Sequence, residues 1–546
     1  MGRKVKAAMA KYVITYDIGT TGIKTCLIEI DSEMRILGSS SLGYGLYVDD
    51  EVGVKGGAEQ HEDEWWEAMC VTTKAVFEKV PYIKKEQIEG ISFCSQMQGL
   101  VLVDKEGNCV RRPMSYMDQR AREELKEGIA HGIKIAGAEV TKLLKYLRYT
   151  GAVSSSVKDP IWKYKWVEAH EPENFKRVYK WLDVKEYLIC RASGEFVMTE
   201  DSAFATLLYD TRKGHEGWCK PICDMVGVNI EHLPKIMKCT EKVGEVTEKE
   251  AQELGLAPGT AVFGGGGDAS LIGVGAGSVE VGDTHIYSGT SGWVGTVVDK
   301  QVVDAGAMMA AIVGADPNKY NYFGELETSN KCVEWVKNHL ALDDIGVFLH
   351  NKTISDSFES LNLNLYDYME DVIDKVPAGS NGTIFTPWLH GNRCPFEDPN
   401  AAGMFFNIKI ETGKTELIRA VVEGICFHMR WMLERQDMKK EVKISETIRF
   451  CGGGALGSVT CQILSDILQR DVEVVDSPQN VGAVGAAACI AVGLNLIPDL
   501  DHVKSLIPAK HIYHPNKENE AVYDRNFTVF KNLYKANKKN FEILNG

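Results

Sequence analysis

The feature that most constrains the fold is a short pattern that occurs twice. Residues 12–31 read as two strands joined by the turn Gly-Thr-Thr-Gly at 19–22, and residues 283–299 read as two strands joined by Gly-Thr-Ser-Gly at 289–292. Glycine-containing turns between runs of strand-forming residues are typical of hairpins. A chain of 546 residues is too long for one core. The repeat therefore favours two related domains that face one another.

The rest of the chain alternates predicted strands and helices, which favours an α/β fold. In the first half, a helix is expected from His61, a strand over 88–95, and a helical pattern from about Lys158 to Arg191 that includes Trp181. In the second half, helices are expected near 414–436, 458–470 and 481–493, with strands between them and a polar surface helix after His511. We expect an N-terminal domain over 12–260, a C-terminal domain over 261–500 and an extension over 501–546.

Composition excludes several classes of protein. The formal net charge is −15, with both signs mixed along the chain, whereas a nucleic-acid surface needs a basic stripe. Any phosphate site must then be built locally, from backbone N–H groups, a metal or a few cations. The 14 cysteines are scattered without a Cys-x-x-Cys pair, as expected for free thiols in a reducing compartment. With neither a signal peptide nor an apolar run of about 18 residues, we expect a cytoplasmic protein without a membrane partner.

Three glycine-rich segments are suited to binding phosphate or a flat ring. Asp17 ends a strand before the turn at 19–22, so its carboxylate can hold hydrated Mg²⁺ beside outward N–H groups, and Lys24 can add a cation. The turn at 288–292 offers similar donors, and the run Cys-Gly-Gly-Gly-Ala-Leu-Gly-Ser over 451–458 opens a helix with little side chain in the way. Each segment taken alone is also compatible with an ordinary turn, and the turn at 288–292 taken alone favours an ordinary hairpin.

Two further segments are suited to a substrate with hydroxyl groups. Four glycines precede Asp268 at the end of a predicted strand, where a lone carboxylate can accept a proton from an attacking hydroxyl; a helix N-cap is the alternative role. The polar runs over 95–99 and 118–120 can hold vicinal hydroxyls, although in isolation surface loops explain them better.

Taken together and in this order, these motifs resemble the FGGY carbohydrate kinase family of the actin, Hsp70 and sugar-kinase superfamily. The segment PWLHGNRCPFEDPNAAGMFFNI over 387–408 is similar to the family signature. The resemblance implies two ribonuclease-H-like (actin-like ATPase) α/β domains with a cleft between them. It also implies transfer of the γ-phosphate of ATP, with Mg²⁺, to a hydroxyl of a small sugar, in an enzyme that can be a homodimer.

The resemblance also implies roles for individual residues. Asp268 is the catalytic base and a substrate-binding residue, and Asp17 holds the metal. The ATP-binding residues are Gly19, Thr20, Thr21, Lys24, Gly289, Thr290, Ser291, Gly453, Gly454, Ala455 and Ser458. The other substrate-binding residues are Gln96, Met97, Gln98 and Asp118.

The sugar side departs from the pattern of the xylulose kinases, which this chain otherwise resembles most within the family. Xylulose kinases typically read Gln-Met-His-Gly and then Trp-Asn-Asp-x-Arg, whereas this chain has Gln98 for the histidine and Tyr116 and Met117 for the Trp-Asn pair. Ala269 follows the predicted base where asparagine is usual. A ketopentose such as xylulose or a related sugar is expected, with gluconate, erythritol, a tetrulose or another polyol as alternatives. An actin- or Hsp70-like ATPase and a sugar sensor without turnover are the rival interpretations.

Overall fold

The computed structural model describes residues 10–129, 131–135, 138–340 and 370–546. These residues form two compact units, each built from discontinuous segments of the chain. Unit 1 comprises Met1–Gly275, Ile312–Tyr320 and Gly482–Leu506, and unit 2 comprises Ala276–Ala311, Asn321–Val481 and Ile507–Gly546. The predicted division at 260 and 500 stays a prediction.

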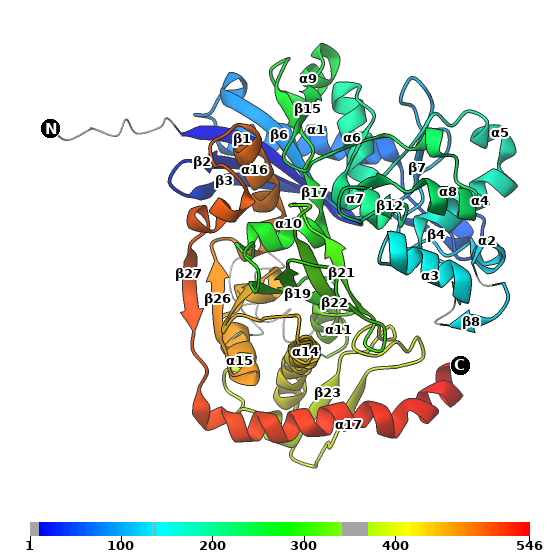
Figure 1. Cartoon of the computed structure of the whole chain (residues 1–546). Helices are drawn as coiled ribbons and strands as arrows, with labels where there is room; N and C mark the ends of the chain where they lie inside the picture. Colours follow the sequence, from blue (N-terminus) through cyan, green and yellow to red (C-terminus); the bar gives the residue numbers. More distant parts are fainter. Residues whose placement is uncertain (1–9, 130, 136–137, 341–369) are drawn as a thin grey trace. The chain divides into compact units, whose positions relative to one another are not determined.

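Unit 1 is built on a mixed sheet with the order β15-β16-β6-β1-β2-β3, in which β17 also pairs with β6 (Figure 1). Strand β6 runs parallel to β1, β16 and β17, whereas β1, β2 and β3 form an antiparallel meander. The strands are β1 Lys11–Ile18, β2 Gly22–Ile30, β3 Met34–Gly43, β6 Ile88–Ser95, β15 Lys242–Glu245, β16 Ala261–Phe263 and β17 Gly266–Gly267. The central strands are buried and therefore consist mainly of apolar residues.

Helices cover this sheet, and an additional lobe extends the unit. The covering helices include α1 Glu62–Lys79, α6 Val184–Ser193, α7 Glu200–Ala205, α9 Glu248–Leu254, α10 Asp268–Gly275 and α16 Val481–Gly493. The lobe has its own apolar cluster and includes β7 Val101–Val103, α2 Arg122–Gly128, α3 Val140–Tyr149, α4 Pro160–His170, α5 Pro172–Phe175, β10 Lys180–Leu182 and α8 Lys220–Val226.

Unit 2 contains a sheet with the order β20-β21-β22-β19-β18-β25-β26-β27. Strands β18, β25 and β26 are mutually parallel, and β19 pairs antiparallel with β18. The strands are β18 Thr284–Ser288, β19 Gly292–Val298, β20 Val303–Asp304, β21 Met309–Val313, β22 Tyr320–Leu326, β25 Thr447–Cys451, β26 Asp471–Val475 and β27 Ala509–Tyr513. Further elements are α11 Asn330–His339, β23 Ile384–Thr386, β24 Met404–Phe406, α14 Lys414–Asp437, α15 Ser458–Leu468 and α17 Glu520–Asn545.

Two predictions need correction. The helical pattern expected from Lys158 to Arg191 is interrupted by β10, in which Trp181 pairs antiparallel with Leu102 of β7; pairing across the lobe overrides local apolar spacing here. The stretch from His511, expected as a polar surface helix, first completes strand β27, and the helix α17, the long red helix of Figure 1, covers Glu520–Asn545 and buries Tyr523 and Phe530 on one face.

Two features of the structure concern the expected cellular compartment. All 14 cysteines are free thiols, and most of them are buried. Among the described residues, no helix combines the length and apolar character needed to cross a bilayer.

Candidate active site

Three parallel strands of unit 1 end together and bring separate motifs to one edge of the sheet. In the register of the sheet, Asp17 of β1 lies beside Cys94 of β6, and Gly267 of β17 lies beside Ser95. Asp17, Gln96 and Asp268 therefore lie at the carboxyl ends of adjacent strands, although up to 251 residues separate them. This edge is the usual position of ligand sites in open α/β sheets.

Asp17 lies close to a lysine and to a cysteine thiol. It lies directly opposite Lys24 in the hairpin β1–β2. Burial raises the pKa of the Asp17 carboxyl, and Lys24 and a hydrogen bond with the Cys94 thiol oppose that rise. Burial likewise raises the pKa of the Cys94 thiol, and the charges of Asp17 and Asp268 raise it further. One thiol thus interacts with both carboxylates, which agrees with their positions at the strand ends.

The first glycine turn is closed by a hydrogen bond from the Gly19 amide to the Gly22 carbonyl, at 2.9 Å. Gly19 and Thr21 are exposed, and Thr20 is half-buried. The Thr20 hydroxyl contacts the Tyr116 hydroxyl at 3.3 Å, so the predicted phosphate turn touches the predicted sugar side.

Asp268 is the first residue of α10 and is half-buried. Its Oδ1 accepts the amide hydrogen of Ala269 at 2.8 Å, so both roles expected from the sequence, base and helix cap, remain compatible with its surroundings. The preceding Gly267 packs so closely on Met97 that a Cβ atom there would lie 2.1 Å from the methionine sulfur. The glycine therefore lets the Asp268 segment approach the predicted sugar-binding run.

Of the predicted sugar-binding residues, Gln96 and Asp118 are buried, which removes the interpretation of surface loops for these two, and Met97 and Gln98 are half-buried. Gln96 donates from Nε2 to Oε1 of Gln60 at 3.1 Å, and Gln60 donates in turn to the Thr20 carbonyl at 2.7 Å. Oε1 of Gln96 has no hydrogen-bond partner among the residues that the structure describes. A buried acceptor of this kind is costly unless a ligand or water satisfies it.

Gln98 and Asp118 are fixed by hydrogen bonds to neighbouring segments. Gln98 has a left-handed backbone, with φ +63°, and its amide donates to the Ala205 carbonyl at 3.3 Å. The Asp118 carboxylate is fully buried and accepts hydrogen bonds from the Ala58 amide and from Nε and Nη2 of Arg120, at 2.7–2.9 Å. Asp118 is therefore held in an internal ion pair, and its contact with sugar stays a prediction.

Unit 2 brings the other two glycine segments together in the same way. Tyr287 of β18 lies beside Cys451 of β25, so Ser288 and Gly452 follow at adjacent strand ends. Gly452 has φ +90°, and a Cβ atom there would lie 2.4 Å from the Ser288 carbonyl oxygen. Thr290 is exposed and Gly289 and Ser291 are half-buried.

A largely apolar pocket lies under this second glycine segment. Its lining includes Gly454, Ser288 and Asn330, together with aliphatic and sulfur-containing side chains: Val333, Val422, Ile425, Cys426, Met429 and Leu464. Ala455 is buried beside it and Ser458 begins α15. The cavity has a volume of about 30 Å³, which is room for a water molecule rather than a ring, so an adenosine site at this segment stays a prediction.

Three residues of these sites were not predicted. Gln60 joins Thr20 to Gln96, and Asn330 donates from its amide to the Ser288 carbonyl at 3.1 Å. Lys163 is fully buried and donates to the carbonyls of Gln98 and Ser115, both at 2.8 Å. The available signal was Lys163 between Trp162 and Tyr164, in a helical run at 160–167 whose other charged residue is Lys165; a lysine that becomes buried needs a partner.

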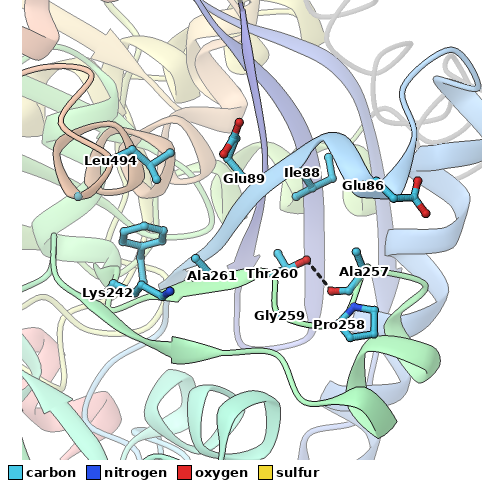
Figure 2. A pocket seen from close by; sticks show the side chains of 12 residues that line it. Glu86, Ile88, Glu89, Lys242, Ala257, Pro258, Gly259, Thr260, Ala261 and Leu494 are labelled. Carbon is cyan, nitrogen blue, oxygen red and sulfur yellow. Dashed lines mark hydrogen bonds between the residues drawn. The ribbon is translucent and has the colours of Figure 1, made fainter.

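A second pocket, of about 420 Å³, lies in unit 1 and away from these residues. Figure 2 shows it at the amino ends of β6 and β16, with Lys242, Glu86 and Glu89 at its rim and the Thr260 hydroxyl bonded to the Ala257 carbonyl. It contains none of the predicted site residues, so the sheet edge described above remains the candidate site.

Comparison with known proteins agrees with this geometry. Residues 12–275 match the N-terminal domain model of the FGGY family of carbohydrate kinases, and residues 285–494 match its C-terminal domain model. A xylulose kinase of Bacillus subtilis is 26% identical over 532 residues, 97% of each chain. A gluconokinase of the same organism is 25% identical over 527 residues, 96% of each chain. The ligand-bound xylulose kinase structure from Lactobacillus acidophilus superposes with a TM-score of 0.79 at 25% identity, over 97% of this chain and 99% of that one. The predicted fold class, two actin-like α/β domains, is confirmed.

Proposed function

Because the chain belongs to the FGGY family of carbohydrate kinases, we propose that it transfers the γ-phosphate of Mg-ATP to a hydroxyl of a small sugar. The observation that carries this proposal is the shared sheet edge of unit 1, where strand register brings Asp17, Gln96 and Asp268 together. A site for phosphoryl transfer needs a metal ligand, polar groups for the acceptor and a proton acceptor in one place.

The residues present fit the nucleotide and its metal. Mg²⁺ keeps most of its waters and is commonly bound through one or two carboxylates and substrate phosphates, so the single half-buried carboxylate of Asp17 suffices. The metal would neutralise phosphate charge. The N–H groups and hydroxyls of both glycine turns, with Lys24, are assigned to the phosphates. Gly453, Gly454, Ala455 and Ser458 of the second glycine segment are assigned to the adenosine.

In the reaction, the sugar hydroxyl oxygen forms a bond with the γ-phosphorus while the bond to the β-phosphate oxygen breaks and ADP leaves. The hydroxyl proton passes to the Asp268 carboxylate. Gln96, Met97, Gln98 and Asp118 are assigned to binding and orienting the sugar. The unsatisfied Oε1 of Gln96 is an acceptor suited to a sugar hydroxyl.

The acceptor is proposed to be a ketopentose such as xylulose or a related sugar. Relatives named for xylulose and for gluconate are about equally similar to this chain, so gluconate, erythritol, a tetrulose or another polyol remain candidates. Because Gln98 and Ala269 depart from the xylulose kinase pattern, D-xylulose is not expected to be the preferred substrate. Turnover with ATP across a panel of pentuloses, tetruloses, polyols and aldonates tests this, and a clear preference for D-xylulose would contradict it.

The same panel separates the kinase from an actin- or Hsp70-like ATPase. A kinase consumes ATP in proportion to the sugar phosphate formed, whereas the rival hydrolyses ATP at a rate that no sugar changes. The proposal includes a cytoplasmic location and leaves room for a homodimer, which light scattering of the purified protein would detect.

The role of Asp268 is tested with Asp268→Asn. The substitution keeps the shape and an acceptor for the Ala269 amide but cannot take a proton. If Asp268 is the base, kcat falls by about 10²–10⁴-fold while binding and melting temperature are retained. If Asp268 is only a helix cap, asparagine serves nearly as well and turnover stays near the parental value.

A further inference from the structure

A buried polar network lies directly behind the strand β17, which ends one residue before the proposed base. At its centre is Asp201 of α7, which is 1% exposed. Its Oδ2 accepts the amide hydrogen of Gly267 at 2.8 Å, and its Oδ1 accepts hydrogen bonds from the Thr199 hydroxyl at 2.5 Å and the Cys239 thiol at 3.3 Å. Gly267 immediately precedes Asp268, so this carboxylate holds the peptide from which the proposed base projects.

The donor and the acceptor of each hydrogen bond in this network can be assigned. The fully buried Lys185 ammonium, which forms an ion pair with Glu186, donates to the Thr199 hydroxyl oxygen at 2.6 Å. Because an ammonium group can only donate, Thr199 uses its own hydrogen for Asp201. The three groups that hydrogen-bond to Asp201 within the described residues are then all donors, and only a carboxylate can accept from both of its side-chain oxygens in this way. This arrangement explains why a charged side chain is retained in the interior, where an unpaired charge is costly.

The helix that carries Asp201 also contacts the sugar side. Helix α7 begins one residue before Asp201 and ends at Ala205, whose carbonyl accepts the Gln98 amide at 3.3 Å. A single short helix thus holds the Gly267 peptide at one end and Gln98 at the other. Displacement of α7 would change the position of the proposed base relative to the sugar.

We propose that Asp201 is a positioning residue of the kinase, which fixes the Gly267 peptide and thereby orients Asp268 toward the acceptor hydroxyl. The inference rests on the proposed function, because it assigns Asp201 a purpose only if Asp268 is the base. Asp201 itself lies behind the strand and does not touch the substrate.

The test is a double-mutant cycle between Asp201→Asn and Asp268→Asn. Asparagine at 201 turns an NH₂ group toward one of the donors, which displaces the Gly267 peptide, and misplacement by about 1 Å can cost 10²-fold in rate. We expect Asp201→Asn to lower kcat by about 10- to 100-fold with the KM for ATP unchanged. In the Asp268→Asn background the same substitution should change kcat by less than about twofold, because residues that act through one another are not additive.

Three outcomes would overturn the inference. An equal effect of Asp201→Asn in both backgrounds would indicate a general structural role, and a stable Asp201→Asn protein with parental kcat would indicate no role in turnover. Parental turnover of the Asp268→Asn single mutant would refute the base itself, and this result is read separately from the cycle. Glu423→Gln is the matched control: Glu423 is also buried, and it accepts hydrogen bonds from Gly379, Ser380 and Arg419 in unit 2, so it should lower stability without coupling to Asp268.

A second pair of variants covers the case in which Asp201→Asn does not fold. Thr199→Val keeps the shape of the side chain but removes the hydroxyl between Lys185 and Asp201, and it should lower kcat in the same non-additive way. Thr199→Ser restores the hydroxyl and should restore kcat. Failure of serine to rescue turnover in a folded protein would contradict the proposal.

Discussion

Lys163 offers a sharp test of how the sugar side is held. Its side chain is fully buried, and its ammonium joins two separate segments by donating to the carbonyls of Gln98 and Ser115. Burial lowers the pKa of Lys163 from 10.5 to about 8, although Asp118, Asp183 and Asp159 favour its charged form and Lys158 opposes it. Lys163→Met removes the ammonium but keeps most of the apolar stem.

The free-energy terms of this substitution have opposite signs. A pKa shift of this size corresponds to about 3 kcal/mol, the cost of keeping the charge inside the fold. Methionine removes that cost but leaves two carbonyls without their donor, at about 1–3 kcal/mol each. We therefore expect stability to change by no more than about 3 kcal/mol. Because the tether between the two segments is lost, the KM for the sugar should rise about tenfold, with the KM for ATP within twofold of the parental value.

The pH dependence of stability has a definite sign. The pKa of Lys163 is lower in the folded than in the unfolded protein, so the unfolded state binds more protons between pH 8 and 10.5 and stability rises with pH. From pH 7 to 9 the parent should gain about 1 kcal/mol relative to the methionine variant. Asp183 adds to this difference between the two proteins. Burial raises the pKa of Asp183 to about 7, and loss of the nearby cation in the methionine variant raises it further. Because a carboxyl with a raised pKa lowers stability as pH rises, the variant loses more stability than the parent.

The assay compares denaturant unfolding of the parent and Lys163→Met at pH 7 and pH 9, together with steady-state kinetics for both substrates. The difference between the two proteins cancels the titration of groups far from Lys163. A difference that does not vary with pH, or an unchanged KM for the sugar in a folded variant, would refute the reasoning.

Three further substitutions test other parts of the site. Asp17→Ala should lower Mg²⁺-dependent turnover by at least about 100-fold while the melting temperature moves by only a few degrees, since the carboxylate is proposed to bind metal rather than to support a core; parental turnover would contradict the metal assignment. Gln98→His should shift preference in the sugar panel toward D-xylulose without loss of stability, because histidine tolerates the left-handed backbone at this position, and an unchanged ranking would exclude Gln98 as a specificity residue. Asn330→Ala removes the side-chain bond to Ser288 and should raise the KM for ATP about 3- to 10-fold with the KM for the sugar unchanged, whereas equal effects on both would indicate a general structural defect.

Local signals in the sequence were sufficient for the elements but not for all their neighbours. The glycine turns and the strands that flank them follow from residue type and alternation, and both hairpins are present as predicted. The strand that contains Trp181 was missed because its partner, β7, lies some 80 residues earlier in the chain, and apolar spacing alone cannot distinguish a buried strand from a buried helix.

In the site, too, local sequence signals identify some residues, whereas others depend on contacts between distant segments. Asp17 and Asp268 could be proposed from their position after predicted strands, and their residue types suit the chemistry. Their common neighbour Cys94, and the links made by Gln60 and Lys163, depend on strand register and on contacts between distant segments. No local pattern encodes such pairings, since register is decided by which faces become buried.

The two hairpins share a similar four-residue turn sequence but differ in the register of their strands. In the first, Ile18 pairs with Ile23 and encloses four residues; in the second, Ser288 pairs with Gly292 and encloses three. The shorter second turn changes which side chains lie opposite one another. Asp17 therefore faces Lys24 across the first hairpin, whereas Tyr287 faces Trp293 across the second, with their rings stacked at 4.1 Å.

The residue types at these equivalent positions, together with the register, separate the chemistry that each turn can perform. The first hairpin presents a carboxylate and a cation beside its turn, so it can hold a metal ion as well as phosphate. The second has an aromatic pair in the corresponding place, and its turn offers only N–H groups and hydroxyls, which are donors to phosphate oxygens. A triphosphate already carries several negative charges, and a second unneutralised carboxylate beside it would repel it. The duplicated fold therefore need not carry a duplicated metal site, and Asp17 is the carboxylate whose loss should abolish metal-dependent turnover.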